Sequence, residues 1–228
     1  MSTIIGICSS KFCLLVADRR SVSIHDGSIS LINDKTDKIF KLNDDVVYGV
    51  TGVFAEGEEL LDPLNCLNNN KNITLNKVLN AIKNYTIDKF PIIKSCKHRN
   101  YIFGGKQNGK YHLCIIQYNA QTEKFEYNEF TPTGDGIDYH IILPNNAIPF
   151  ENELKSDMSE IFTKAKTVDE LILETVKVIA KIADIDNTVG KTMNYYIVKW
   201  NISVITKRSS KRKHSKIGVL SFYSKQKT

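Results

Sequence analysis

Ser2 carries the features of an N-terminal nucleophile. Because Ser2 is small, Met1 is expected to be removed easily, which would leave one residue with both a hydroxyl and a free α-amine. An α-amino group has an unperturbed pKa of about 7.7–8.0, so much of it can act as a base near neutral pH. A hydroxyl activated by a neighbouring base is an established nucleophile. The start of the chain therefore predicts covalent catalysis by Ser2.

Two short apolar runs must position this residue. Thr3–Cys8 and Phe12–Ala17 have the composition of strands, and the polar residues 9–11 between them form a tight turn. Asp18 closes the second run and is followed by two arginines. Periodicity predicts further strands at 38–42, 46–51, 100–105, 110–118, 124–131, 193–200, 202–206 and 217–223, helices at 74–89 and from Thr167, a turn at 24–28 and a short element at 134–143.

The order of these elements predicts the fold class. Strands and helices come in separate blocks and do not alternate as β-α-β units, which argues against a doubly wound parallel sheet. Asn108-Gly109 is a strong hairpin signal, and Thr167 with Glu170 forms a capping box at a helix start. We therefore expect an α+β fold of two antiparallel sheets with helices outside them, as a single domain over residues 1–228.

The composition argues against several classes of protein. The chain is 42% hydrophobic and 25% charged, and no apolar run is long enough to cross a membrane. No basic segment precedes the first apolar run, so no signal peptide is expected. The five cysteines contain no C-x-x-C pair, and the five histidines lack metal-ligand spacing. We expect a cytoplasmic protein with reduced thiols and no zinc site.

A basic segment at 207–216 accounts for the net charge. It holds six lysines and arginines, which equals the formal charge of +6, so the rest of the chain is close to neutral. The segment contains no Phe, Tyr or Trp that could stack on a base, and it falls between two expected strands. We interpret it as a solvated hairpin loop and do not expect nucleic-acid binding; a phosphate-binding, targeting or partner-binding patch is the alternative.

A series of short motifs follows Ser2 in a fixed order. Asp18 and Arg20 close the second strand, Lys38 opens a Lys-Ile-x-x-Leu strand, and Gly52 ends the next strand. At these spacings the chain resembles the proteasome β-subunit family of N-terminal nucleophile hydrolases, which includes the peptidase of the bacterial two-component protease. The resemblance covers roughly residues 2–200 and extends to two later elements, Gly134-Asp135-Gly136 and Asp186-Asn187-Thr188-Val189-Gly190.

The resemblance implies a four-layer α-β-β-α sandwich and a role for each matching residue. Ser2 Oγ would attack a carbonyl while its amine relays the proton, and Asp18 would hold the buried ammonium of Lys38 beside the nucleophile. The N–H of Gly52 would bind the developing oxyanion. Asp135 and Asp186 complete the expected site.

Three departures from the family pattern keep the catalytic interpretation open. The nucleophile is serine, whereas active proteasomal peptidases use threonine. Asp135 and Val189 stand where the family has serines that organise the terminal amine. Lys35 competes with Lys38, because the interval before Lys38 is longer than usual in the family. Structural roles are the alternatives for the others: a strand-end salt bridge for Asp18, a turn glycine for Gly52, and helix caps for Asp135 and Asp186.

The resemblance also implies a substrate pocket and an ion site. The pocket would be lined by Ser21, Val22, Val50 and Phe54, and the bulk of Phe54 would narrow it. No cofactor is expected to be required. A structural Na⁺ or Mg²⁺ would be held by the backbone carbonyls of Ala183, Asp186 and Val189.

The lead hypothesis is a proteasome-like peptidase that cleaves polypeptides with Ser2 inside a homo-oligomer. A catalytically inactive proteasome-like structural subunit and a hydrolase of small amides are the alternatives. An unfoldase or another regulator is an expected partner, and no membrane partner is expected. Only Met1 precedes Ser2 in the sequence, so no autocatalytic removal of a propeptide is expected.

Overall fold

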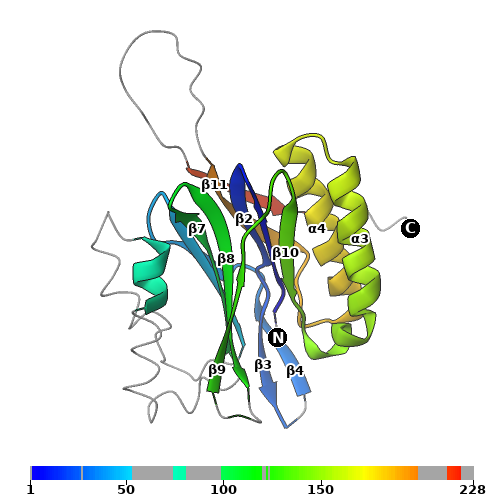
Figure 1. The fold of residues 1–228 in the computed structure, drawn as a ribbon. Coiled ribbons are helices and arrows are strands. Elements are labelled where there is room, and N and C mark those ends of the chain that lie inside the picture. Colours follow the sequence, from blue (N-terminus) through cyan, green and yellow to red (C-terminus); the bar gives the residue numbers. More distant parts are fainter. Residues whose placement is uncertain are drawn as a thin grey trace.

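Two five-stranded antiparallel sheets lie face to face in the computed structural model (Figure 1). The structure describes residues 2–26, 28–52, 74–80, 99–119, 122, 124–199 and 215–221. In spatial order, the first sheet contains β10 (Ile137–Ile142), β1 (Ile4–Ser9), β2 (Phe12–Asp18), β11 (Thr192–Lys199) and β12 (Ser215–Ser221). The second contains β5 (Ile39–Lys41), β6 (Val46–Gly52), β7 (Arg99–Gln107), β8 (Lys110–Asn119) and β9 (Lys124–Phe130).

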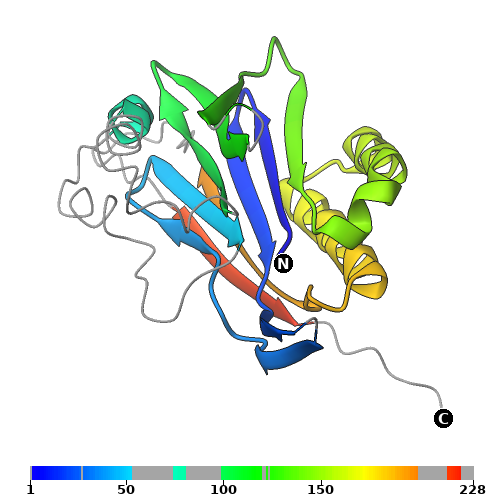
Figure 2. The same cartoon turned by 90° about the horizontal axis from the view of Figure 1, so that it is seen from below.

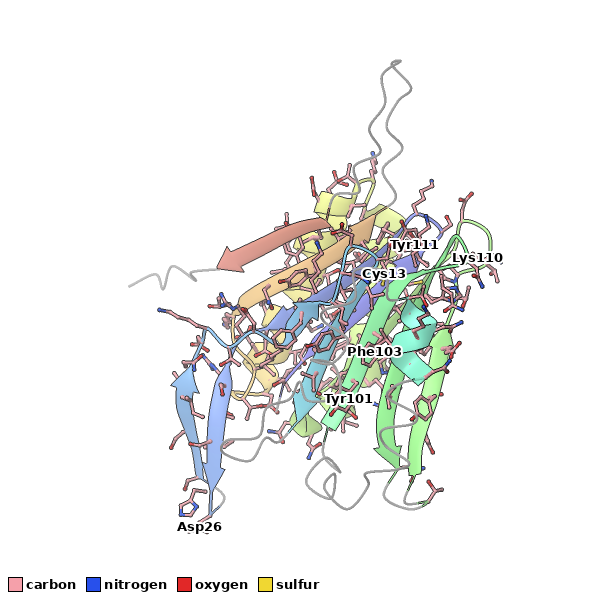
Figure 3. The ribbon with its side chains drawn as sticks, turned by 90° about the vertical axis from the view of Figure 1, so that its left-hand side faces the viewer. Cys13, Asp26, Tyr101, Phe103, Lys110 and Tyr111 are labelled. Atoms are coloured by element: carbon pink, nitrogen blue, oxygen red, sulfur yellow. The ribbon has the colours of Figure 1, made fainter. Side chains whose placement is uncertain are left out.

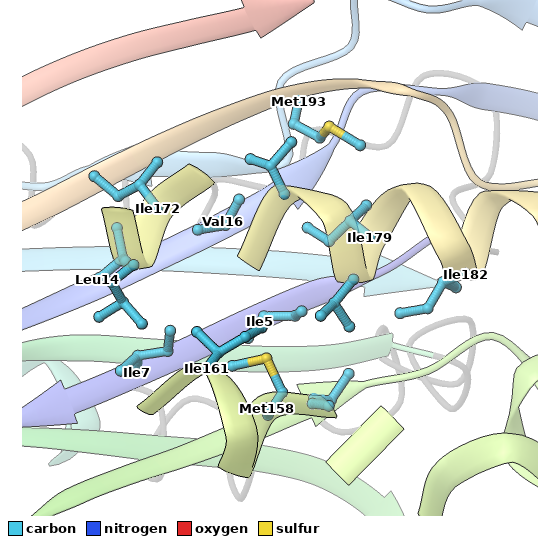
Figure 4. Packing of buried hydrophobic residues seen from close by; sticks show 14 of the residues in the cluster. Ile5, Ile7, Leu14, Val16, Met158, Ile161, Ile172, Ile179, Ile182 and Met193 are labelled. Atoms are coloured by element: carbon cyan, nitrogen blue, oxygen red, sulfur yellow. The ribbon is translucent and has the colours of Figure 1, made fainter. Parts of the chain in front are cut away.

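Helices cover the outer face of each sheet. After η2 (Asn145–Phe150), α3 (Glu151–Lys164) and α4 (Val168–Ile185) pack on the first sheet (Figures 2 and 4). A helical segment at 75–80 packs on the second sheet, where Leu75 and Val78 join a cluster with Phe103. The result is the four-layer α-β-β-α sandwich that the sequence predicts. The expected capping box is also present, since Glu170 N–H donates to Thr167 Oγ1 at 3.1 Å.

Strands β1 and β2 are buried on both faces, which explains their continuous apolar runs. Successive side chains alternate between the helix-covered face and the face toward the second sheet. Ile5 and Leu14 face α3 and α4 (Figure 4), whereas Ile4 and Leu15 fill the space between the sheets. These two strands therefore lie at the centre of the fold and hold the chain start rigidly.

Glycines leave room for close packing between the sheets. A Cβ on Gly6 would lie 2.4 Å from Ile102 Cδ1, and one on Gly104 would lie 2.4 Å from Cys13 Sγ. Because Cβ atoms essentially never approach other atoms so closely, these positions require the absence of a side chain unless a neighbour shifts. Figure 3 labels Cys13 in this region, whereas Phe103 points to the outer face of the second sheet.

A two-stranded ribbon is the main element that the sequence analysis missed. β3 (Ser21–His25) and β4 (Ser28–Asn33) form a separate antiparallel hairpin where only a turn at 24–28 was expected. The signal was present in the sequence, because Asp26-Gly27 lies between two alternating polar and apolar runs. Asp26 adopts a φ of 49°, as a tight hairpin turn requires. No bounds for helix α3 were predicted from the sequence.

Several expectations lie outside the described residues. These include Phe54, residues 81–89 of the helix expected at 74–89, the strand at 202–206 and most of the basic segment, of which the structure describes only Ser215 and Lys216 in β12.

We expect Cys8 and Cys13 to be inert in the folded protein. They are fully buried and lie opposite each other in β1 and β2. Burial raises the pKa of Cys8 to about 12 and also raises that of Cys13, so almost no thiolate forms at pH 8. Peptide mapping after iodoacetamide treatment should find both unlabelled in native protein and labelled in urea. Labelling of either residue under native conditions would contradict this assignment.

Candidate active site

The carboxylate of Asp18 is the centre of a buried hydrogen-bond cluster at the end of β2. Its side chain is fully buried. Oδ1 accepts the N–H of Thr3 at 2.9 Å, while Oδ2 accepts the N–H groups of Arg20 at 2.9 Å and Gly190 at 3.1 Å. One carboxylate thus joins the start of β1, the end of β2 and the loop after α4. A buried charge requires partners of this kind.

Lys38 supplies the positive charge opposite Asp18. Its Nζ lies 2.7 Å from Asp18 Oδ2, and only 6% of the residue is exposed. Burial lowers the pKa of Lys38, and the attraction of Asp18 and Asp34 opposes this effect. Lys35, the competing lysine, is exposed to solvent. The structure therefore places Lys38 beside Asp18, and Lys35 outside the buried cluster.

Ser2 is held next to this ion pair by its neighbour in the sequence. It is half-buried, and it directly precedes Thr3, whose N–H and carbonyl both bond to Asp18. The chain start, the end of β2 and the residue before β5 therefore meet at one end of the sandwich, where Figure 1 marks the N-terminus. Ser2 is therefore one residue from the Asp18–Lys38 pair, and its role as the nucleophile stays a prediction.

Gly52 ends β6 beside the same cluster. The N–H of Val50 donates to the carbonyl of Lys38 at 2.9 Å, which fixes the end of β6 against the residue that carries the ammonium. Gly52 follows two residues later with a φ of 123°. Residues with a side chain rarely adopt this backbone angle, so a glycine is required here.

Asp135 does not belong to this cluster, contrary to the expectation from the sequence. It is exposed on the turn before β10. Because β10 is antiparallel to β1 with Ile137 opposite Ser9, this turn lies at the far end of β1, about 20 Å from Thr3 at the usual strand rise. The end of β10 beside the start of β1 continues into residues 143–145, Leu-Pro-Asn.

Asp186 is buried in the loop that leads to Gly190. It is the C-cap residue of α4, and its Oδ1 accepts the N–H of Thr188 at 2.8 Å and the Thr188 hydroxyl at 2.5 Å. Its Oδ2 is buried without a hydrogen-bond partner among the described residues. The hydroxyl group bonded to Asp186 in this loop therefore belongs to Thr188, a residue to which the sequence analysis assigned no role. Val189, which stands where the family has a serine, is buried.

The expected cation site falls on the same loop. Ala183 lies in the last turn of α4, and the Asp186 carbonyl accepts the N–H of Val189 at 3.0 Å. The unpartnered Asp186 Oδ2 adds an oxygen of the kind that Na⁺ or Mg²⁺ prefers, so these residues fit such an ion. The described residues contain no group of three His, Cys, Asp or Glu side chains that could hold a metal. An ion held by the three carbonyls stays a prediction.

Three of the four expected pocket residues are described. Ser21 and Val22 begin β3 and are half-buried, while Val50 is buried in β6. Ser21 follows Arg20, whose N–H donates to Asp18, and the N–H of Val50 donates to the Lys38 carbonyl, so Ser21 and Val50 lie close in the chain or by hydrogen bonding to the Asp18–Lys38 pair. That they line a substrate pocket stays a prediction.

Asp34 is a residue of this region that the sequence analysis missed. Arg20 Nε and Nη2 donate to its two carboxylate oxygens at 2.7 and 3.1 Å, and Arg20 Nη1 donates to the Asn187 carbonyl at 3.0 Å. The hydrogen bonds from Arg20 lower the pKa of Asp34. No sequence motif joins residues 20, 34 and 187, because the contact depends on the tertiary fold.

Asp34 should contribute stability only above the acid range. Because its folded pKa is lowered from an ordinary 3.8, the contribution is fully present above about pH 5 and is lost as the pH falls through the folded pKa. The difference in free energy of unfolding between wild type and Asp34→Asn should therefore shrink below pH 4. Urea unfolding from pH 7 to pH 2 measures it; a difference that does not change with pH would contradict the assignment.

Comparisons with known proteins identify the fold and the family. The crystal structure of eukaryotic HslV from Trypanosoma brucei matches with a TM-score of 0.58 and 16% identity, over 86% of this chain and 99% of the HslV chain. At this identity the match shows the fold. A search of curated protein sequences found no match. None of the described helices is long and apolar enough to span a membrane. The family model for proteasome subunits matches residues 1–198, so the chain belongs to the proteasome subunit family.

Proposed function

We propose that this chain is a peptidase subunit of the proteasome type and that Ser2 becomes its nucleophile once Met1 is removed. The observation that carries the proposal is the buried Asp18–Lys38 pair. Its carboxylate accepts the N–H of Thr3, the residue directly after Ser2. Burying an ammonium and a carboxylate costs several kcal/mol of desolvation for each ion. This cost is explained if the two charges serve catalysis, because a fixed ammonium stabilises the negative charge that develops on an attacking hydroxyl oxygen.

The proposed reaction is an acyl transfer to Ser2 followed by hydrolysis. The Ser2 α-amine accepts the proton of the hydroxyl as Oγ attacks the peptide carbonyl, and it then protonates the leaving amine. The Lys38 ammonium stabilises the oxygen nucleophile, and Asp18 keeps Lys38 in place. The N–H of Gly52 binds the negative charge that develops on the carbonyl oxygen. Water then cleaves the Ser2 ester and releases the acid product.

A subunit without peptidase activity is the second candidate, and specific observations favour it. Asp135 lies far from the cluster, and the loop after α4 offers buried Val189 where a polar group would organise the terminal amine. Of the residues 143–145 that follow β10, only Asn145 has a polar side chain, and it is exposed. In this case the Asp18–Lys38 pair would serve only to join β1, β2 and β5.

Hydrolysis of fluorogenic peptides separates the two candidates. The peptidase proposal expects turnover by purified wild type with Met1 removed, loss of turnover in Ser2→Ala, and its retention in Ser2→Thr. A wild type with Met1 removed that cleaves no peptide in a broad library would overturn the proposal. Turnover of small amides by that same protein, with no peptide cleavage, would favour the small-amide hydrolase.

We also infer that the subunit functions in a homo-oligomer. Family membership supports this, as do three exposed apolar side chains on β4: Ile29, Leu31 and Ile32 are 42, 59 and 60% exposed. Exposed apolar strands promote association unless they are covered. Mass photometry of wild type should show an assembly larger than the monomer, and a monomer at all concentrations would contradict the inference. An unfoldase partner stays a prediction.

A further inference from the structure

The ribbon of β3 and β4 needs an anchor outside itself. It is the smallest sheet in the described structure, and all six residues of β4 are exposed. Figure 3 shows it standing apart from the two large sheets, with Asp26 at its tip. An isolated two-stranded hairpin is marginally stable at best in water. Its position relative to the site must therefore be set by contacts at its base.

A bidentate ion pair joins the two strands at the base of the ribbon. Arg20 precedes β3 and Asp34 follows β4, so their contacts at 2.7 and 3.1 Å close the ribbon at its open end. The third Arg20 contact, to the Asn187 carbonyl at 3.0 Å, fixes the closed ribbon to the loop after α4. The planar guanidinium suits this task because it can donate to a carboxylate and to a carbonyl at once.

The same contacts reach Asp18 through the backbone. The N–H groups of Arg20 and Gly190 both donate to Asp18 Oδ2. A Cβ on Gly190 would lie 2.8 Å from Arg20 Cβ and 3.0 Å from Asp34 Oδ1, so the loop packs directly against the ion pair. Ribbon, loop and buried carboxylate therefore form one connected unit.

We propose that Arg20 and Asp34 clamp the β3–β4 ribbon in a fixed position against the Asp18 cluster, and that Asp34 is a positioning residue for binding of the polypeptide substrate. The second part rests on the proposed peptidase function. Ser21 and Val22, the first ribbon residues, border the expected substrate pocket, so loosening the ribbon moves one wall of that pocket. Ser2 and Lys38 are attached to other strands and keep their places.

Backbone hydrogen exchange tests the clamp without requiring activity. Asp34→Asn removes the charge from the acceptor and Asp34→Glu restores it, while Glu174→Gln removes an unrelated surface ion pair with Lys177 on α4. We expect exchange within β3 and β4 to be about tenfold faster in Asp34→Asn, near wild type in Asp34→Glu, and unchanged in Glu174→Gln, with β2 protected in all four proteins. Unchanged ribbon exchange in Asp34→Asn would overturn the clamp.

Kinetics on the same variants test the positioning role. Asp34→Asn should raise KM for peptide substrates severalfold and leave kcat within twofold of wild type, and Asp34→Glu should restore KM. A fall in kcat with unchanged KM would overturn the substrate-binding role. If wild type shows no turnover, the peptidase proposal and this role fail together, whereas the exchange experiment still decides the clamp.

Discussion

Replacing Lys38 with methionine is expected to lower the free energy of unfolding by about 3–5 kcal/mol, because it leaves the buried carboxylate of Asp18 without its counter-charge. The pair is among the most buried ion pairs described, with side-chain exposures of 8% for Lys38 and 0% for Asp18. Urea unfolding at pH 7 measures the change. Under the proposed mechanism any peptidase activity should also be lost, because the ammonium proposed to stabilise the nucleophile is gone.

Lys35→Met is the matched control. The two lysines are three residues apart, but Lys35 is exposed, so its replacement should change the free energy of unfolding by no more than about 0.5 kcal/mol. The double variant Asp18→Asn/Lys38→Met should be more stable than Lys38→Met alone, because the unpaired charge is removed. Equal effects of the two single lysine variants would refute the assignment of Lys38 to the buried pair.

Gly49→Val should be the second strongly destabilising change, by about 3 kcal/mol, through overpacking between the sheets. A Cβ on Gly49 would lie 2.8 Å from both Ile39 Cγ2 and Ile4 Cδ1. Ile39 follows Lys38 and Ile4 follows Thr3, so the clash pushes apart the two strands that carry the site. Thermal unfolding monitored by circular dichroism measures the loss.

Gly109→Val separates this clash from the general cost of replacing a glycine. Gly109 has a φ of 81°, and a Cβ at this position would meet no atom within 4 Å outside the adjacent residues. The cost of the substitution is therefore conformational and of order 1–2 kcal/mol. If Gly49→Val were no more destabilising than Gly109→Val, close contact between the sheets would not be what requires a glycine at position 49.

The central strands could be predicted because local pattern and tertiary environment agree there. The apolar runs at Thr3–Cys8 and Phe12–Ala17 became β1 and β2, shifted by one residue at most at each end. The capping box at Thr167 marked the start of α4 for the same reason, since its two hydrogen bonds are local. Such local patterns predict structure correctly because the residues that form them are close in sequence.

The misplacement of Asp135 has a topological cause. Gly134-Asp135-Gly136 has the composition of the expected motif, but composition does not say which end of β1 the turn reaches. The antiparallel pairing of β10 with β1 decides this, and it places the turn beside Ser9. The Arg20–Asp34–Asn187 contacts were missed for a related reason, because they join three segments that come together only in the folded chain.

Intact mass spectrometry before and after incubation with a peptide epoxyketone tests the proposed role of Ser2 most directly. This reagent needs both a free terminal amine and a hydroxyl on the same residue to close its ring. We predict that the purified protein lacks Met1, gains the mass of one inhibitor, and gains nothing when Ser2 is replaced by alanine. Retained Met1 with no adduct would contradict the nucleophile and favour a subunit that does not cleave peptides.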